Sequence, residues 1–254
     1  MRAALGLAGA LAMASVAPGC GWRSGFLELT TDQKLDSARA DLEARKWGRA
    51  VEKFRILAGV YRGTAQFPEV QYGLGRAYAG LEDIPSAERE LGVVVREYPE
   101  SDWADDASLA IAEAYVGQIR ASQLEQTTTY QAIDRLREFL RKFPGSALAP
   151  EAESLLVISR SQLAKKEYEN GRLYLRLQDG PAARVHFETV LREYADTPWC
   201  AAAQFGMAEA LCEEERADEA LAAYRAVVER DSTGDLARSS LERIQAIEAR
   251  RRCP

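Results

Sequence analysis

Few residues in this sequence could perform acid–base, nucleophilic or metal chemistry. The chain has 254 residues with a single histidine, His186, and four cysteines, so the usual ligands of a metal site are scarce. No serine lies in a nucleophile-elbow pattern, and one histidine on an amphipathic helix gives little support for a catalytic triad. We therefore predict that the protein is not an enzyme and needs no metal or cofactor.

The composition is that of an ordinary globular protein and argues against nucleic-acid binding. Apolar residues make up 47% of the chain and charged residues 28%, which excludes disordered, collagen-like and multi-span membrane classes. Thirty-three Lys and Arg face 39 Asp and Glu, giving a net charge of −6. A nucleic-acid-binding protein would be expected to carry an excess of basic residues instead.

The first residues have the pattern of an export signal. Met1-Arg2 supplies a positive start, and residues 3–17 form an uncharged, largely apolar run that is shorter than the ~20 residues of a spanning helix. The run ends in Val16-Ala17-Pro18-Gly19-Cys20, which resembles the lipobox of bacterial lipoproteins. Residues 1–19 are then a signal peptide, and Cys20 is the lipidated N-terminus that anchors the chain at a membrane. The alternative is a plain signal peptide with an incidental cysteine.

The other three cysteines, Cys200, Cys212 and Cys253, would be exported to an oxidising compartment, where pairing is possible. Cys200 and Cys212 lie on one predicted helix about 18 Å apart, well beyond the ~7 Å limit for a disulfide. A link from Cys253 to either one stays open, as does the alternative of buried thiols and a frayed tail.

An internal repeat sets the expected fold. One column of the self-alignment is always alanine, and the columns four and seven residues later are always apolar. These spacings put all three columns on one face of a helix. The columns contain Ala50, Ala87, Ala132, Ala183 and Ala220; Phe54, Leu91, Leu136, Phe187 and Tyr224; and Leu57, Val94, Phe139, Val190 and Val227.

A second helix precedes this one in each copy. Twelve residues before the alanine column the chain has small residues, Ala38, Gly75, Gly171 and Ala208, with Ala112 in that place if the third copy carries an insertion. Small residues facing a large one on the partner helix allow two backbones to approach closely. Together these columns are similar to the tetratricopeptide (TPR) pattern and predict five helix pairs.

Proline placement agrees with this prediction, because proline in a helix interior is costly. The prolines that fall in predicted helices all occupy first turns, and no alternating run long enough for a sheet is present. The fold class is therefore all-α, an α-solenoid of five TPR pairs with a C-terminal capping helix. The expected pairs are 31–46 with 48–62, 68–81 with 84–98, 102–119 with 130–143, 149–178 with 181–194, and 198–214 with 217–230, and the cap is 234–252.

Two irregularities add a family resemblance. A polar loop, Arg120 to Thr129, lengthens the third repeat, and the helix over 149–178 is about twice the usual length. With the lipobox and the segment Ala164-Lys165-Lys166-Glu167-Tyr168-Glu169-Asn170-Gly171-Arg172-Leu173-Tyr174, these features make the chain resemble the BamD family, the TPR lipoproteins of the β-barrel assembly machinery. The segment Leu191 to Thr197 is also similar, although Ala195 replaces the proline usual there.

The resemblance implies a domain plan and a function. Residues 20–30 would be a lipidated linker, 31–100 the first two repeats with a groove for substrate peptides, and 101–254 the remaining repeats and cap, a scaffold for partners. The function implied is a non-enzymatic periplasmic scaffold, lipid-anchored at the outer membrane. Its partners would be the POTRA region of a BamA-like barrel protein, other lipoproteins of the machinery, and C-terminal segments of unfolded outer-membrane proteins, with no nucleic acid.

Candidate binding residues follow from the repeat positions that face the concave side. In the first two repeats these are Leu35, Arg39, Tyr72 and Arg76, which would suit an extended peptide with aromatic side chains and a terminal carboxylate. The alternative is that the arginines are solvated surface residues. The family's partner contacts would correspond to Arg184 and His186, and the alternative for His186 is an exposed or half-buried helix residue.

A competing function shares every helix with this one. Another envelope TPR lipoprotein, which coordinates cell-wall synthesis, secretion or envelope complexes, would differ only in its partners. The sequence does not determine the exact partners, whether the gene is essential, the redox state of the cysteines or the oligomeric state.

Overall fold

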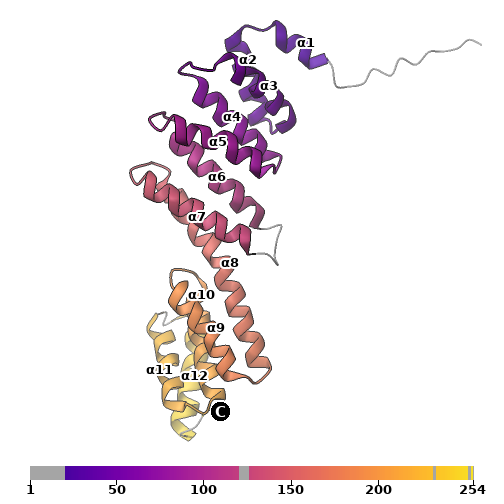
Figure 1. Ribbon diagram of the computed structural model, residues 1–254. Coiled ribbons are helices and arrows are strands. Elements are labelled where there is room, and N and C mark those ends of the chain that lie inside the picture. Colours follow the sequence, from indigo (N-terminus) through magenta and orange to yellow (C-terminus); the bar gives the residue numbers. More distant parts are fainter. Residues whose placement is uncertain (1–20, 120–125, 231–232, 251–252, 254) are drawn as a thin grey trace, which may run out of the picture.

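The computed structural model describes residues 21–119, 126–230, 233–250 and 253. Within these residues every regular element is an α-helix. The helices follow one another along an elongated rod, with α1 at one end and α12 at the other (Figure 1). Their bounds are α1 Gly21–Glu28, α2 Thr31–Glu43, α3 Trp47–Val60, α4 Phe67–Gly80, α5 Ile84–Glu97, α6 Ala104–Ile119, α7 Thr127–Lys142, α8 Ala149–Arg176, α9 Gly180–Glu193, α10 Trp199–Glu213, α11 Ala217–Arg230 and α12 Asp235–Arg250.

The helices form two rows. Each helix packs against the next one in the chain, and the even-numbered helices α2, α4, α6, α8, α10 and α12 also contact one another in that order. Among the described residues, the odd-numbered helices from α3 to α11 make no comparable contacts with each other. The even-numbered helices therefore form an inner row and the others an outer row, which confirms the all-α solenoid of five pairs with a capping helix.

The repeat columns meet as close contacts between small and large residues. The alanine, large and aliphatic columns are all buried. A Cβ added to Gly171 would lie 2.7 Å from Phe187, and one added to Gly206 on α10 would lie 2.5 Å from the same ring. Gly75 faces Leu91 in the same way, at 2.4 Å. The large residue of each outer helix thus fills the space that small residues on the inner helices leave open.

Four turns have a common backbone conformation that the sequence did not indicate. Arg45, Glu82, Gln178 and Glu215 have φ of 55°, 61°, 58° and 59°, and each directly follows the end of an inner helix. Residues with side chains rarely adopt this left-handed region, and glycine is the usual choice at a helix end. Each is followed by a residue whose N–H bonds back to the helix, as Lys46 does to the carbonyl of Asp41 at 2.8 Å. The corresponding turn of the third repeat lies outside the described residues.

Several helices begin with an N-cap hydrogen bond or a proline in the first turn. Thr30 and Gln33 form a reciprocal capping box at α2, and Asp83 and Asp179 cap α5 and α9 by accepting backbone N–H bonds. Proline occupies the first turn of α4, α5, α8 and α9. These features fix where the helices of several pairs begin.

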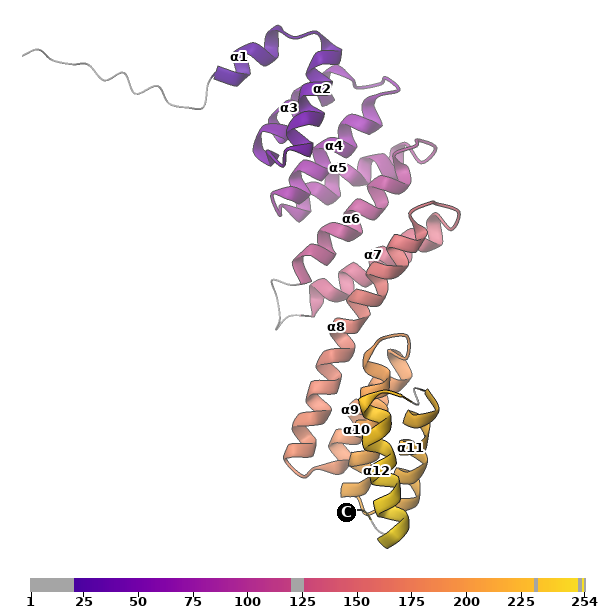
Figure 2. The ribbon, with the colours of Figure 1, turned by 180° about the vertical axis from the view of Figure 1, so that it is seen from behind.

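Helix α8 joins the two halves of the rod. It has 28 residues; its first part packs on α6 and α7, and its later part packs on α9 and α10 (Figure 2). The predicted double-length helix is therefore present. The predicted loop from 120 to 129 is shorter than expected, since α7 begins at Thr127, and residues 120–125 lie outside the described part of the chain.

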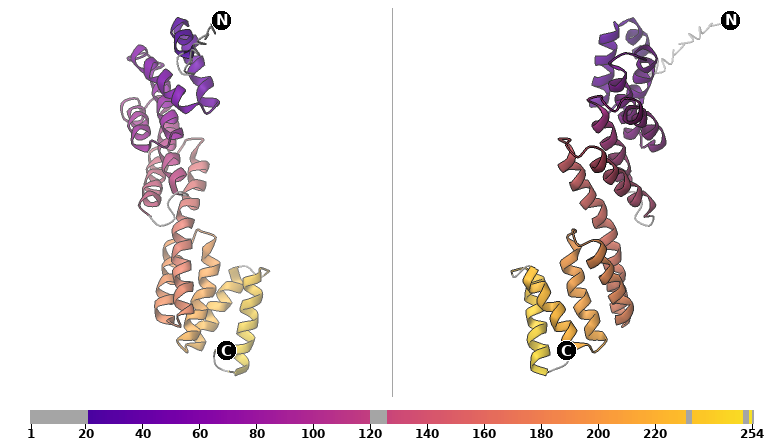
Figure 3. Two further views of the ribbon diagram at one scale, coloured as in Figure 1. Left: turned by 90° about the vertical axis from the view of Figure 1, so that its right-hand side faces the viewer. Right: turned by 60° about the vertical axis from the view of Figure 1, so that its left-hand side comes forward.

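The two ends of the rod carry a short helix that the sequence did not predict and a disulfide that it left open. Helix α1 forms in the segment 20–30, which we expected to be a linker, because Phe26 buries its ring to 3% exposure against the first repeat. At the other end, a disulfide joins Cys212 on α10 to Cys253, with Cα atoms 5.3 Å apart, and Cys200 is a buried free thiol. The bridge ties Cys253, which follows α12, to α10 of the last pair, and Figure 3 shows α12 at the C-terminal end of the rod.

Candidate peptide-binding groove

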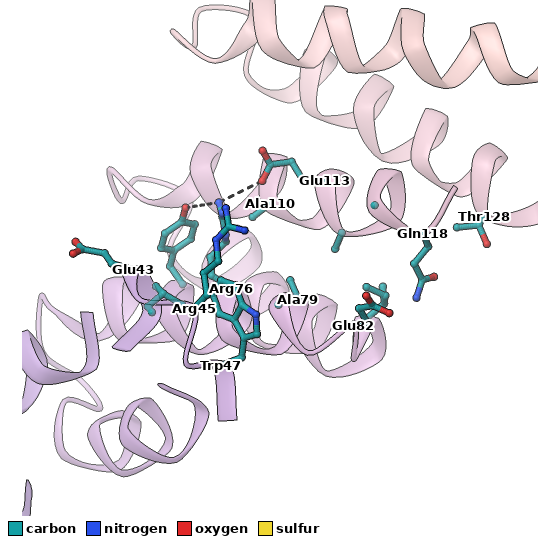
Figure 4. A pocket seen from close by; sticks show the side chains of 16 residues that line it. Glu43, Arg45, Trp47, Arg76, Ala79, Glu82, Ala110, Glu113, Gln118 and Thr128 are labelled. Atoms are coloured by element: carbon teal, nitrogen blue, oxygen red, sulfur yellow. Dashed lines mark hydrogen bonds and ion pairs between the residues drawn. The ribbon is translucent and has the colours of Figure 1, made fainter. Parts of the chain in front are cut away.

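A groove of about 790 Å³ crosses the inner row of helices over the first three repeats (Figure 4). Its walls come from the end of α2, the turn before α3, and α4 and α6, with Thr128 of α7 at one margin. The sixteen lining residues are Leu42, Glu43, Arg45, Trp47, Tyr72, Arg76, Ala79, Gly80, Glu82, Ile84, Ala110, Glu113, Ala114, Gly117, Gln118 and Thr128. The lining residues come from three successive inner helices, α2, α4 and α6.

Small residues keep the floor of the groove open. Gly80, at the end of α4, lies directly against Trp47, and a Cβ there would sit 2.3 Å from the indole ring. Ala79, Ala110 and Ala114 add only methyl groups to the wall. These residues form an apolar surface beside the Trp47 indole ring.

One arginine is held in the wall by a partly buried polar network. Arg76 donates through Nη1 to the Tyr72 hydroxyl at 3.1 Å and to Glu113 at 3.3 Å. The Tyr72 ring packs on Trp103 with centroids 4.9 Å apart. Burial raises the pKa of the Tyr72 hydroxyl and of the Glu113 carboxyl, and Arg76 opposes both effects. This network positions the Arg76 guanidinium along the groove.

A second arginine was missed by the sequence reasoning. Arg45 lines the same groove from the left-handed turn after α2, is exposed, and has no ion-pair partner among the described residues. It is a free cation that could receive a carboxylate. Only the turn geometry reveals it, because nothing in the local sequence distinguishes Arg45 from other surface arginines.

The groove carries charge of both signs. Glu43, Glu82 and Glu113 line it together with the two arginines. Figure 4 shows Glu82, Gln118 and Thr128 at one end of the groove, away from Arg76. Glu43 and Glu113 lie on the same side of the groove as Arg45 and Arg76, and Glu113 is ion-paired with Arg76.

The four predicted peptide-binding residues separate into two groups. Tyr72 and Arg76 line the groove. Leu35 does not reach an open surface, since it is 5% exposed and packs in the core of the first repeats, and this part of the expectation is corrected. Arg39 is half-exposed outside the groove, where its Nε donates to Glu69 at 2.6 Å and Nη1 to Asp36 at 2.9 Å.

Arg184 and His186 lie on α9 but contact opposite neighbours. Arg184 donates through Nε to Glu214, just after α10, at 2.9 Å. Burial alone would raise the pKa of the Glu214 carboxyl, but hydrogen bonds from Arg184 and Arg216 outweigh it, so the pKa is lowered. His186 bonds Glu167 on α8 through Nδ1 at 2.8 Å and stacks on Tyr174. Val185, between them, is 58% exposed. The two residues flank an apolar surface position.

The described residues contain no cluster of three or more potential metal ligands. Nor does any helix among them have the length and apolar character needed to cross a membrane. Cys20, the predicted lipidation site, lies outside the described residues and directly precedes α1.

A solenoid of paired helices with a peptide-sized groove along its inner row defines a helical repeat protein of the TPR class. Residues 28–227 match the YfiO family, described as an outer membrane lipoprotein, and the chain belongs to this family. The resemblance to the BamD family is thereby confirmed.

Two relatives are both named outer membrane protein assembly factor BamD. The protein from Caulobacter vibrioides is 29% identical over 220 residues, which cover 82% of this chain and 70% of the relative. The protein from Rickettsia prowazekii is 23% identical over 156 residues, covering 61% of this chain and 62% of the relative.

Two solved structures are more remote. A thermophilic TPR protein of Thermus thermophilus is 19% identical with a TM-score of 0.38, covering 84% of this chain and 98% of that one. The TPR2AB domain of yeast Sti1 in its pHSP90 complex is 17% identical with a TM-score of 0.43, covering 82% and 80%.

Proposed function

We propose that this protein is a non-enzymatic scaffold of outer-membrane β-barrel assembly, anchored through a lipidated Cys20 on the periplasmic face of the outer membrane. The family match over residues 28–227 carries this proposal. The names of the relatives, both assembly factors, support it. The inner groove supports a role in receiving an extended polypeptide.

In this proposal, the groove over the first three repeats takes the C-terminal segment of an unfolded outer-membrane protein. Aromatic side chains of the segment would pack near Trp47 and the alanines of α6, and the terminal carboxylate would pair with Arg45 and Arg76. Glu82 at the far end disfavours the reverse orientation. The peptide therefore enters with its carboxylate toward the turn after α2.

The C-terminal repeats would hold the POTRA region of a BamA-like partner. Val185 offers an exposed apolar contact, and the ion pairs of Arg184 and His186 fix its surroundings. Other lipoproteins of the machinery would bind the same half. In the competing function, another envelope complex would occupy these surfaces, and the proteins that co-purify with the chain distinguish the two.

Binding of a fluorescent barrel-terminal peptide tests the groove. We expect Arg45→Ala and Arg76→Ala each to weaken binding at least about tenfold, because each removes a charge-assisted hydrogen bond of ~1.5 to 3 kcal/mol. Arg39→Ala and the remote Arg141→Ala should change little. Amidation of the peptide should remove most of the difference between the variants.

Unchanged affinity in both Arg45→Ala and Arg76→Ala would overturn the assignment of the groove. An equal loss in Arg141→Ala would show that general charge, rather than this groove, determines the binding.

A further inference from the structure

The first repeat contains one buried carboxylate surrounded by three cations. Asp41 lies 2.5 Å from Lys53 Nζ, 3.2 Å from Arg49 Nε and 3.9 Å from Lys46 Nζ. Lys53 is also buried, and it donates to the carbonyl and the hydroxyl of Ser37 at 3.0 and 2.7 Å. Because Lys53 already balances the charge of Asp41, Arg49 and Lys46 contribute surplus positive charge.

Helix α1 covers this cluster with two aromatic rings. The Trp22 ring lies 5.5 Å from both Arg49 Cζ and Lys53 Nζ, and the Phe26 ring lies 5.4 Å from Lys53 Nζ. Cations over ring faces attract the ring quadrupole, and Phe26 is buried to 3% exposure. Helix α1 is therefore docked on α3 through cation–π contacts and apolar burial.

The result is a basic surface at one end of an acidic rod. Side chains of Lys46 and Arg49 are 54% and 42% exposed, and Arg23, which follows Trp22 on α1, is also exposed. Among the described residues, exposed Glu52 on α3 is not ion-paired with any of the three. The chain as a whole has a net charge of −6. We name Arg23, Lys46 and Arg49, with Trp22, the N-terminal basic patch.

We propose that the N-terminal basic patch binds the anionic headgroups of phospholipids in the membrane that holds Cys20. The inference rests on the proposed lipid anchor, since α1 begins at Gly21, directly after that cysteine. The acyl chains are then followed at once by a helix fixed to the first repeat, and this surface has to lie at the bilayer. Trp22 suits the headgroup level, where tryptophan is enriched.

Headgroup binding by the patch would orient the protein on the membrane as well as attach it. Lipid chains alone hold a protein at the membrane without fixing its angle, whereas headgroup contacts from α1, α3 and the turn before α3 define a plane. Each Lys or Arg near an anionic surface strengthens binding about fivefold. The first repeat would therefore face the membrane, and the rod would project from it at a set angle.

Vesicle binding tests the patch independently of acylation. The chain from residue 20 with Cys20→Ser is mixed with vesicles of phosphatidylcholine, alone or with one-third phosphatidylglycerol, and the bound fraction is measured by sedimentation. We expect binding to the anionic vesicles only, lost at high salt because exposed charges are screened. Arg23→Gln/Arg49→Gln should weaken it about 25-fold, as two charges are removed.

Two further variants make the result decisive. Arg23→Gln/Lys46→Gln removes two charges but leaves the short contacts of Asp41 intact, so it is the appropriate variant if Arg49→Gln disturbs folding. Arg137→Gln/Arg141→Gln on α7 is the matched control and should bind as the parent does. Equal binding to neutral and anionic vesicles, unaltered binding in both patch variants, or an equal loss in the control would overturn the proposal.

The vesicle assay tests the basic patch and the peptide assay tests the groove, so a negative result in one leaves the other proposal standing. A protein that binds the barrel peptide but not anionic vesicles would retain the proposed function and lose only the patch. A protein that binds anionic vesicles but not the peptide would retain the patch and lose the proposed role of the groove.

Discussion

Phe187 shows how single residues hold the solenoid together. Its ring contacts Gly171 on the helix before it and Gly206 on the helix after it, so one side chain bridges two successive inner helices. The repeat columns in the sequence predict this contact because they combine a small residue with a large one at a fixed spacing. Another repeat uses Leu91 against Gly75 in the same way.

A double-mutant cycle at Gly171 and Phe187 tests this packing. We expect Phe187→Ala to reduce the free energy of unfolding by roughly 3 to 5 kcal/mol through a cavity. Gly171→Ala should cost roughly 1 to 3 kcal/mol, because its methyl overlaps the ring. The double variant should cost less than the sum, since each change relieves the other. Urea unfolding provides the measurement.

Gly117→Ala is the control for the cycle, because a Cβ there meets nothing within 4 Å. It should stabilise the protein by roughly 0.5 to 1 kcal/mol through backbone entropy. Strict additivity at Gly171 and Phe187 would contradict the proposed contact.

Individual functional residues were harder to predict than core residues. Tyr72 and Arg76, which were chosen as concave positions, line the groove, and their role in peptide binding stays a prediction. Leu35 was wrong because side chains of α3 and α4 close a core around it that repeat spacing does not reveal. Arg45 was missed because its exposure in the groove depends on a left-handed turn that usually selects glycine.

At the scale of elements, helix positions were predicted well where periodicity and proline agree. The ten helices of the five pairs and the capping helix begin and end close to their expected bounds. Helix α1 escaped prediction because eight residues are too few for a periodic pattern. The sequence also did not show whether Cys253 pairs with Cys200 or with Cys212. Only the packing of α12 brings Cys253 within reach of Cys212.

The disulfide should contribute strongly to the stability of the C-terminal cap. It closes a loop with a sequence separation of 41 residues, for which chain entropy predicts about 4 kcal/mol. We expect reductant to lower the melting temperature and to make α12 sensitive to protease. Calorimetry and limited proteolysis, with and without reductant, measure both effects.

Cys253→Ser separates the disulfide from other effects of reductant. The variant should already melt at the lower temperature and should not respond further. A reductant effect of the same size in this variant would show that the bridge is not the cause.

At the scale of the whole molecule, α8 determines how the two halves are related. It is a single helix that packs against the third repeat at one end and the last repeats at the other, and it contains no proline after its first turn. A break in it should change the shape of the protein while leaving the helix pairs on either side intact.

Gln162→Pro tests this role. Gln162 is exposed near the middle of α8, and proline there removes a backbone hydrogen bond at a cost of about 3 kcal/mol. We expect small-angle X-ray scattering to show a changed maximum dimension. Gln162→Ala should leave the scattering unchanged; if the proline variant also does so, α8 is not the connection that sets the shape.

The length of α8 also has a consequence for assembly. Twenty-eight residues in one helix correspond to a rise of about 42 Å. An insertion or deletion of one residue in it would rotate one half by about 100° about the helix axis as well as shifting it. The helix is thus a spacer that tolerates substitution on its exposed side far better than a change of length. Under the proposed function, the number of residues in α8 sets the distance between a peptide in the groove and a partner bound to the last repeats.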